Sequence, residues 1–343
     1  MPHKTQEKIE GKTITVFGGA GFLGRHLIGR LARHGAQVRV AVPDPEAALF
    51  LKPLGDIGQI VAVPCDISRP DTVEAALSGA DGAINLVGIL FEKGKRTFDA
   101  VHVSGARHIA DAVVRMGVDQ LVHISALGAD ETSASNYART KALGEQQVLD
   151  IVPTATVLRP SVVFGPEDGF LNLFAGLAMV SPVLPVFGCP VIPNITFGAD
   201  PLIKVDFYGR GGPHFQPVYV GDVTDAIITA LENKSAEGKT FEVAGPHVYS
   251  FKALMELVME TTGRKKILMP VAFAVAKVAA FFLEWLPHPL LTRDQVTLLK
   301  SDNVASGTLP GLEALGISPS SLGALAPTYL GRFRPPSAQR ARA

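Results

Sequence analysis

The residues best placed for chemistry lie in the stretch "NYARTK" (136–141), where Lys141 follows Tyr137 by four positions. On an α-helix this spacing puts both side chains on one face, a single turn apart. A lysine ammonium beside a phenol favours the phenolate, so the pair can act as a general acid or base near neutral pH. The spacing alone is also typical of an ordinary surface helix, so its meaning depends on whether the fold brings a cofactor to Tyr137.

The elements around this stretch alternate between short apolar runs and segments with helical spacing. Strands are predicted at 13–17, 37–42, 59–63, 82–88, 120–126 and 155–160, and helices at 22–35, 45–52, 71–79, 97–116 and 136–150. Such alternation predicts an α/β fold, a Rossmann-type doubly wound parallel sheet with helices on both faces. Ligands of these sheets bind at the carboxyl ends of the strands, so the residues at those ends form the candidate site.

The first strand runs directly into "GGAGFLG" (18–24), whose glycines are spaced GxxGxxG before a predicted helix. A backbone without Cβ atoms turns tightly and can approach a pyrophosphate closely, and the helix start adds free N–H groups and a positive dipole end. A tight turn that binds nothing is the alternative, but the strand–turn–helix setting favours a dinucleotide. The residues predicted to bind it here are Gly18, Gly21, Phe22, Leu23, Gly24 and Arg25.

Two further strand ends carry residues that suit the same ligand. Asp66 and Ile67 follow the third strand, where an acid and an aliphatic side chain could line an adenine pocket. Leu86 and Gly88 lie at the end of the fourth strand, where a small residue lets a dinucleotide cross. The cofactor is therefore predicted to run across several neighbouring strand ends.

The fifth and sixth strands end at Ser125 and Pro160, and Ser125 precedes Tyr137 by twelve residues. Ser125 could hydrogen-bond a substrate oxygen, Tyr137 could pass a proton and Lys141 could hold the nicotinamide ribose. Each has an ordinary alternative: a serine at a strand end, a half-buried tyrosine, a solvated lysine. Their joint placement on the cofactor side of the sheet favours the functional interpretation, with Pro160 beside them.

Composition and charge narrow the class of protein. The chain has 343 residues, and Lys+Arg equals Asp+Glu at 32 each, so no nucleic-acid surface is indicated. The two cysteines, Cys65 and Cys189, fit no metal or disulfide spacing, and no metal is expected. The first residues contain no apolar signal region, which predicts a cytoplasmic protein with a mobile tail before Lys12.

GxxGxxG after the first strand and YxxxK after the fifth resemble the short-chain dehydrogenase/reductase superfamily, in its atypical or extended, epimerase/dehydratase-like branch. Within it, residues of about 12–318 are similar to the family of nucleotide-binding accessory subunits of respiratory complex I (NADH:ubiquinone oxidoreductase). The similar segments include "FLKPLGDIGQI", "INLVGILFE", "NYARTKALGEQQV" and "LTRDQVTLLKSDNV". The resemblance implies a structurally held NADP(H), at the joint between the peripheral arm and the membrane arm of the complex.

Two departures from the family pattern stand out. Pro43 and Asp44 follow the second strand, where relatives usually place an arginine against the 2′-phosphate of NADP. An acid there suits the free ribose 2′-OH of NAD, although Arg25 and Arg39 could supply positive charge to a phosphate. NADP(H) is therefore only slightly favoured over NAD(H). The second departure is an excursion at 189–207, rich in Pro and Gly, predicted as a surface loop or an extra contact arm.

The domain organisation is predicted to interleave. The NAD(P)-binding core covers 12–165 and is completed by 216–245, a smaller C-terminal subdomain on the substrate side covers 166–215 and 246–330, and 1–11 and 331–343 are flexible tails. In the second half, helices are predicted at 169–180, 222–233 and 250–263, the last with Ser250 as its N-cap, and strands at 216–220 and 240–245.

The segment "PVAFAVAKVAAFFLEWLP" (270–287) is predicted as one apolar helix between two prolines. Sixteen helical residues rise about 24 Å, which is short of the hydrocarbon core of a bilayer. The helix could be buried in the C-terminal subdomain or could present an apolar surface to a membrane or a membrane-embedded partner. The resemblance favours partial exposure of 270–286 to a partner.

These observations lead to two hypotheses of function. The first is an NAD(P)H-binding accessory subunit of a respiratory NADH:quinone oxidoreductase, peripheral at the cytoplasmic face of the inner membrane, with a structural or regulatory cofactor. The second is a free-standing NAD(P)-dependent reductase or epimerase of a small hydroxyl or carbonyl substrate, with quinone metabolism as one possible setting. The retained Ser125, Tyr137 and Lys141 favour the second, and the resemblance along the chain and the apolar helix favour the first.

Overall fold

The computed structural model describes residues 8–197, 203–287 and 289–335. The chain divides into unit 1 (Met1–Pro160, Val220–Val243 and Ser306–Ser318) and unit 2 (Ser161–Tyr219, Ala244–Ala305 and Pro319–Ala343). The predicted tails lie largely outside the described residues. Of the rest, Ile9 is fully buried and Gly331–Phe333 form the 3₁₀ turn η5.

Unit 1 is built on a seven-stranded sheet in which every neighbouring pair is parallel, in the order β13-β6-β5-β4-β1-β2-β3. The strands are β1 Thr13–Phe17, β2 Gln37–Val42, β3 Ile60–Pro64, β4 Gly82–Asn85, β5 Gln120–Ile124, β6 Thr156–Pro160 and β13 Thr240–Val243. The central strands are buried along almost their whole length, as expected when helices cover both faces. The prediction of a doubly wound parallel sheet is confirmed.

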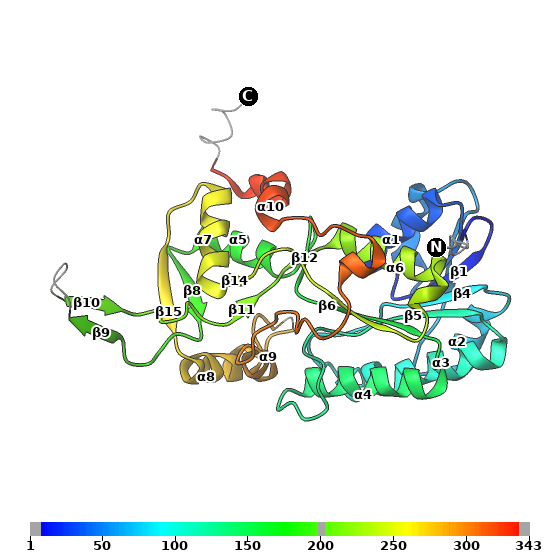
Figure 1. Cartoon of the computed structure of the whole chain (residues 1–343), viewed down its shortest axis with the longest axis horizontal. Helices are drawn as coiled ribbons and strands as arrows, with labels where there is room; N and C mark the ends of the chain where they lie inside the picture. The colour runs from blue at the N-terminus through cyan, green and yellow to red at the C-terminus, as the bar shows by residue number, and fades with distance from the viewer. Residues whose placement is uncertain (1–7, 198–202, 288, 336–343) are drawn as a thin grey trace. The chain divides into compact units, whose positions relative to one another are not determined.

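Helices cover the two faces of this sheet (Figure 1). Helices α1 (Phe22–Arg33) and α6 (Val220–Glu232) pack together on one face, and α2 (Pro70–Leu77), α3 (Gly105–Met116) and α4 (Asn136–Ile151) pack in sequence on the other. The strand order reverses between β1 and β4, because β2 and β3 follow on one side and β5 and β6 on the other. Doubly wound sheets bind their ligands at such a reversal.

The helix predicted over 97–116 is divided in the structure. Asp99–Ser104 form a π-helix, η2, and α3 begins at Gly105. Helix α4 packs directly on η2, because a Cβ atom on Gly144 would lie 1.9 Å from the backbone oxygen of His102. π-Helical turns occur mostly inside α-helices and are frequent at functional sites, so η2 is a candidate part of the functional site.

Short segments of unit 1 also differ from the prediction. The helix expected at 45–52 is a 3₁₀ helix, η1 (Glu46–Leu54), with Pro53 inside it. The strand expected at 82–88 ends at Asn85, so Leu86 and Gly88 lie in the loop after it. The 3₁₀ turns η3 (Lys234–Ala236) and η4 (Leu312–Leu315) complete the unit, and the chain at 306–318 is tied to β13 by a hydrogen bond from Glu242 N to Pro310 O.

Unit 2 packs three helices around an aromatic core. They are α5 (Leu171–Val180), α7 (Phe251–Thr262) and α10 (Leu322–Leu330), and Phe164, Phe174 and Phe251 are among the buried rings between them. Ser250 caps α7 by accepting a hydrogen bond from Ala253 N, as predicted. The paired short strands are β7 (Val163–Phe164) with β12 (Val218–Tyr219), β8 (Val183–Phe187) with β15 (Ile267–Val271), and β11 (His214–Phe215) with β14 (Tyr249–Ser250).

The excursion at 189–207 forms a hairpin of β9 (Asn194–Phe197) and β10 (Ile203–Asp206), and residues 198–202 lie outside the described part. The helix predicted from residue 270 begins later, because Pro270 and Val271 belong to β15, which pairs with β8. Helix α8 therefore covers Phe273–Leu283, and α9 (Arg293–Leu298) follows it.

The contact between α4 and η2 gives a stability prediction. Gly144→Ala drives a methyl group into the backbone of His102, so it should lower the free energy of unfolding by roughly 1–3 kcal/mol. Gly29→Ala in α1 is the matched control, because a Cβ atom there would meet its nearest neighbour, Leu54, at an ordinary 3.5 Å. The control should leave stability unchanged or raise it by up to about 1 kcal/mol. Urea denaturation measures both, and equal midpoints for the two variants would contradict the packing described here.

Candidate functional site

The glycine turn after β1 leaves a helix start open to solvent. Gly21 is the N-cap of α1, makes no side-chain capping hydrogen bond, and is followed by no acidic residue in the first turn. Gly18 has a φ of +77°, and a Cβ atom there would lie 3.2 Å from Val87 N, while one on Gly24 would lie 2.3 Å from Gly19 O. Internal packing thus requires both of these glycines. A Cβ atom on exposed Gly21 would meet, among the described atoms, only Gly18 O at 3.3 Å, so the outer side of the turn is open.

The other predicted residues of this turn flank its opening. Phe22, Leu23 and Arg25 are all half-buried, and the Arg25 guanidinium lies 5.2 Å from the centre of the Phe50 ring. Helix-start N–H groups such as those at 22–24 bind anions because the intrahelical ladder leaves them without partners. The turn therefore has the backbone geometry that a pyrophosphate requires.

β2 offers no free arginine to the adenosine ribose, which would bind at the end of this strand. Arg39 Nη1 donates to the carbonyls of Ala76 and Ser78, at 2.7 and 2.9 Å, which holds the guanidinium at the C-terminal end of α2. Asp44 is exposed just beyond β2, and its Oδ1 accepts a hydrogen bond from Glu46 N at 3.1 Å. An acid in this place suits a ribose 2′-OH.

Asp66 and Ile67 lie at the end of β3, and Leu86 and Gly88 beyond β4. Asp66 accepts hydrogen bonds from the backbone and hydroxyl of Ser68, and these lower the pKa of its carboxyl group. Leu86 N donates to Phe17 O at 3.0 Å, which ties the loop after β4 to the glycine turn. Gly88 is exposed in that loop. The structure thus brings the residues after β1 and β4 together at the reversal of strand order.

Lys141 is buried against the end of β5. Its Nζ donates to Ile124 O at 2.6 Å, next to Ser125. Ser125 is 4% exposed, and its Oγ has no hydrogen-bond partner among the described residues. A buried hydroxyl without a partner is costly, so a ligand atom at this position would satisfy it. Pro160 ends β6, the next strand, and its carbonyl accepts from Leu127 N.

Burial controls the protonation of the Tyr137–Lys141 pair. Burial lowers the pKa of Lys141 to about 8, although the nearby Glu145 carboxylate acts in the opposite direction. Burial raises the pKa of Tyr137 to about 12, which is contrary to the expectation that the lysine favours the phenolate. Tyr137 is therefore a neutral phenol near pH 7 and is suited to donate a proton.

His102 is the site residue that the sequence analysis missed. It lies in η2, is 3% exposed, and its ring centre is 5.4 Å from that of Tyr137 in an edge-on arrangement. Phe98 also contacts Tyr137 edge-on, at 5.9 Å between ring centres. The signal available in "FDAVHVSGARHIA" was a polar residue within a predicted apolar helix face, and it does not by itself distinguish a site residue from a core histidine.

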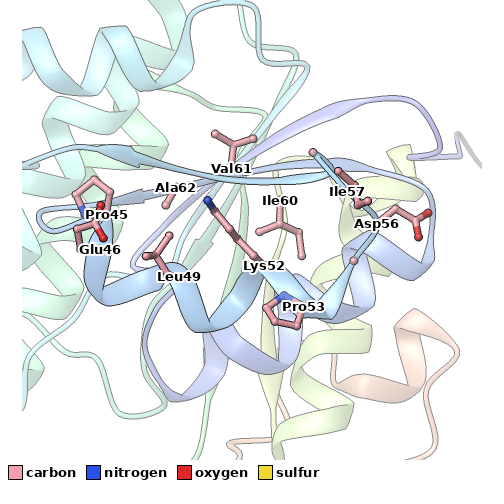
Figure 2. Close-up of a pocket in the computed structure, with 12 residues that line it drawn as sticks. Pro45, Glu46, Leu49, Lys52, Pro53, Asp56, Ile57, Ile60, Val61 and Ala62 are labelled. Atoms are coloured by element: carbon pink, nitrogen blue, oxygen red, sulfur yellow. The ribbon is translucent and has the colours of Figure 1, made fainter.

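A separate hollow of about 630 Å³ opens between η1 and β3, at the edge of the sheet (Figure 2). Its walls include Leu49, Lys52 and Val61, and Lys52 points across it toward the strand. None of the predicted cofactor residues lines it. Over the described ranges, no three His, Cys, Asp or Glu side chains are placed to hold a metal ion. No helix in the described part of the chain is long and apolar enough to cross a membrane.

Three observations in unit 1 fit a dinucleotide: the uncapped start of α1, the open side of Gly21, and the buried Ser125 hydroxyl that lacks a partner among the described residues. They lie at the ends of β1 and β5, on either side of β4, so a ligand that is long and carries both an anionic and a hydroxyl-rich part would reach them. Nicotinamide dinucleotides have this chemistry.

Comparison with known proteins agrees with this geometry. Residues 14–244 match the NAD dependent epimerase/dehydratase family. The chain is 33% identical over 326 residues to "NADH dehydrogenase [ubiquinone] 1 alpha subcomplex subunit 9, mitochondrial" of Mus musculus, covering 94% of this chain and 81% of that protein. It is also 36% identical to the ceramide reductase of Caulobacter vibrioides, over 174 residues that cover 50% of this chain and 53% of that protein.

Among solved structures, the UDP-glucose 4-epimerase of Thermus thermophilus in complex with NAD is similar, with a TM-score of 0.64. The two sequences are 19% identical, and the similarity covers 94% of this chain and 98% of that one, so it supports the fold alone. On the family match and the mouse relative, the chain belongs to the NAD dependent epimerase/dehydratase family, in the branch of the mitochondrial NADH dehydrogenase subunits.

Proposed function

We propose that this protein is an NAD(P)H-binding accessory subunit of a respiratory NADH:quinone oxidoreductase, with a cofactor whose role is mainly structural or regulatory. The observation that carries the proposal is the similarity to the mouse NADH dehydrogenase subunit, which spans 94% of this chain and 81% of that one. A similarity of this extent includes unit 2 as well as the nucleotide-binding unit. The proposed place is the cytoplasmic face of the inner membrane, next to subunits near the membrane arm.

The proposed nucleotide lies across the ends of β1, β4 and β5. Its pyrophosphate rests on the turn at Gly18–Arg25, the adenine lies toward Asp66 and Ile67, and the chain of the dinucleotide passes Leu86 and Gly88. Lys141 and Tyr137 receive the nicotinamide ribose, with Ser125 and Pro160 beside the ring. A nicotinamide held here would place a hydride donor or acceptor beside the protonated Tyr137 hydroxyl, whether or not a reaction follows.

The resemblance favours NADP(H), and the residues after β2 favour NAD(H). Arg39 donates to two carbonyls, and Arg25 is the other basic residue proposed to meet a 2′-phosphate. Exposed Asp44 instead suits a free 2′-OH. We retain NADP(H) as the proposed cofactor, and tighter binding of NADH than NADPH would assign the specificity to Pro43 and Asp44.

The nucleotide site is tested by Gly21→Asp. The substitution places a carboxylate at the open side of the turn, where it would repel a pyrophosphate, so binding of NADPH and NADH should weaken by at least about 100-fold. Gly169→Asp is the matched control, because it adds the same charge at an exposed position of unit 2 with open space around it. Calorimetric titration measures both variants, and wild-type protein that bound neither nucleotide would defeat this part of the proposal.

Helix α8 supports the proposed contact of 270–286 with a membrane-bound partner. Only Ala276 and Ala280 of this helix are buried. Val278, Phe282 and Trp285 are 63%, 67% and 81% exposed, which does not favour a helix buried in the core. Phe281 is partly covered by the Arg293 guanidinium, 5.3 Å from its ring centre. Clustered exposed apolar side chains on a soluble protein mark interaction sites, and aromatic anchors often contribute about 2 kcal/mol or more each.

Phe282→Asp combined with Trp285→Ser tests this contact. Because both side chains are exposed, the double variant should keep the melting temperature and nucleotide binding of the wild type, yet leave the membrane fraction on gentle lysis. Ala276→Asp is the contrasting control, since a charge at this buried position should destabilise the protein. A double variant that melted early, or that stayed with the membranes as firmly as the wild type, would exclude the proposed contact.

The free-standing reductase remains a second candidate because the Ser125 hydroxyl is buried without a partner among the described residues and Tyr137 is protonated. The ceramide reductase relative covers 50% of this chain, so it supports this candidate less than the mouse subunit, which covers 94%, supports the first. If the protein is an enzyme, Tyr137→Phe removes the proton donor and should cost on the order of 10²–10⁴ in rate.

A further inference from the structure

His102 makes two side-chain hydrogen bonds that neither hypothesis of function uses. Its Nε2 lies 3.1 Å from Ile89 N, and its Nδ1 lies 3.0 Å from the Thr140 hydroxyl. Ile89 belongs to the loop after β4, directly after Gly88, and Thr140 lies in α4, three residues after Tyr137. The imidazole therefore joins the two segments that hold the middle and the nicotinamide end of the proposed nucleotide.

The direction of these hydrogen bonds follows from the groups involved. A backbone N–H can only donate, so Nε2 of His102 must accept from Ile89 and carries no proton. In the neutral ring Nδ1 then bears the hydrogen and donates to the Thr140 hydroxyl, whose own hydrogen points to Asn136 O at 2.8 Å. The three hydrogen bonds therefore all donate in one direction: the Ile89 amide donates to His102, His102 donates to Thr140, and Thr140 donates to Asn136 O in the first turn of α4.

Two further features hold His102 in this arrangement. Burial, together with the charge of Lys141, lowers the pKa of His102 to about 3, so the ring stays neutral and Nε2 stays an acceptor. The backbone is fixed as well, because Gly144 allows α4 to approach the carbonyl of His102 as closely as it does. Protonation of the ring would set two donors, Nε2–H and the Ile89 amide, against each other.

We propose that His102 is a positioning residue for the dinucleotide: by accepting from Ile89, it fixes the loop after β4 over which the nucleotide crosses. The inference rests on the proposed nucleotide binding. The Nε2 hydrogen bond carries this role and also fixes the tautomer, in which Nδ1 donates to the Thr140 hydroxyl.

Two substitutions test the Nε2 and Nδ1 hydrogen bonds of His102 separately. In His102→Gln the side-chain amide can place an acceptor near the position of Nε2, and in His102→Asn it can place a donor near the position of Nδ1. His102→Gln should therefore bind NADPH and NADH within about threefold of wild type, whereas His102→Asn leaves the Ile89 amide unpaired and should bind about tenfold more weakly. Calorimetric titration measures the affinities, and thermal melting should show similar stability for the two variants.

Hydrogen exchange of the nucleotide-free protein gives an independent reading. The segment that contains Ile89 should exchange as slowly in His102→Gln as in the wild type and faster in His102→Asn, with other segments of unit 1 unchanged. If the two variants show equal affinity and equal exchange at Ile89 while the wild type binds nucleotide, the positioning role is wrong and the proposed function stands. If the wild type binds neither nucleotide, the proposed function fails and this inference fails with it.

Discussion

The candidate site depends on the close contact between the glycine turn after β1 and the loop after β4. A Cβ atom on Gly18 would lie 3.2 Å from Val87 N, and Leu86 N donates to Phe17 O, so the two loops meet backbone to backbone. This is possible because β1 and β4 are neighbours at the point where the strand order reverses. A side chain at Gly18 would separate the two loops, and so would move the glycine turn away from the segment at Gly88 and Ile89.

Helix α4 contributes to the site through one stripe of its surface. Tyr137, Thr140, Lys141 and Gly144 follow the pattern i, i+3, i+4 and i+7, so they lie on one side of the helix. Thr140 and Gly144 contact His102, and Lys141 donates to the end of β5. The stripe therefore locks the helix to both the π-helical turn and the sheet. Such rigid support keeps Tyr137 at a fixed place relative to the loop after β4.

The sequence was most informative where a local pattern determines the structure. β1 and β2 have the predicted bounds, and the glycine turn and the helix that begins at Asn136 are where the pattern indicated. The π-helix η2 was missed because it depends on its contact with α4 at Gly144, about forty residues later in the chain. The hydrophobic periodicity of residues 97–116 contains no sign of that contact. The start of α8 was misplaced for a similar reason: Pro270 and Val271 pair with Val186 and Phe187 of β8, far back in the sequence. The orphan hydroxyl of Ser125 likewise emerges only once β5, α4 and their described neighbours are assembled.

The central claim is that this nucleotide-binding fold works as part of a respiratory assembly. The most direct measurement is affinity purification of the tagged full-length chain from its native membranes in mild detergent, with identification and quantification of the proteins that come with it. Our account predicts near-stoichiometric recovery of NADH:quinone oxidoreductase subunits, with a nicotinamide dinucleotide bound to the chain. Recovery of the chain alone, or with proteins unrelated to that complex, together with turnover of a carbonyl substrate by the isolated chain, would contradict it.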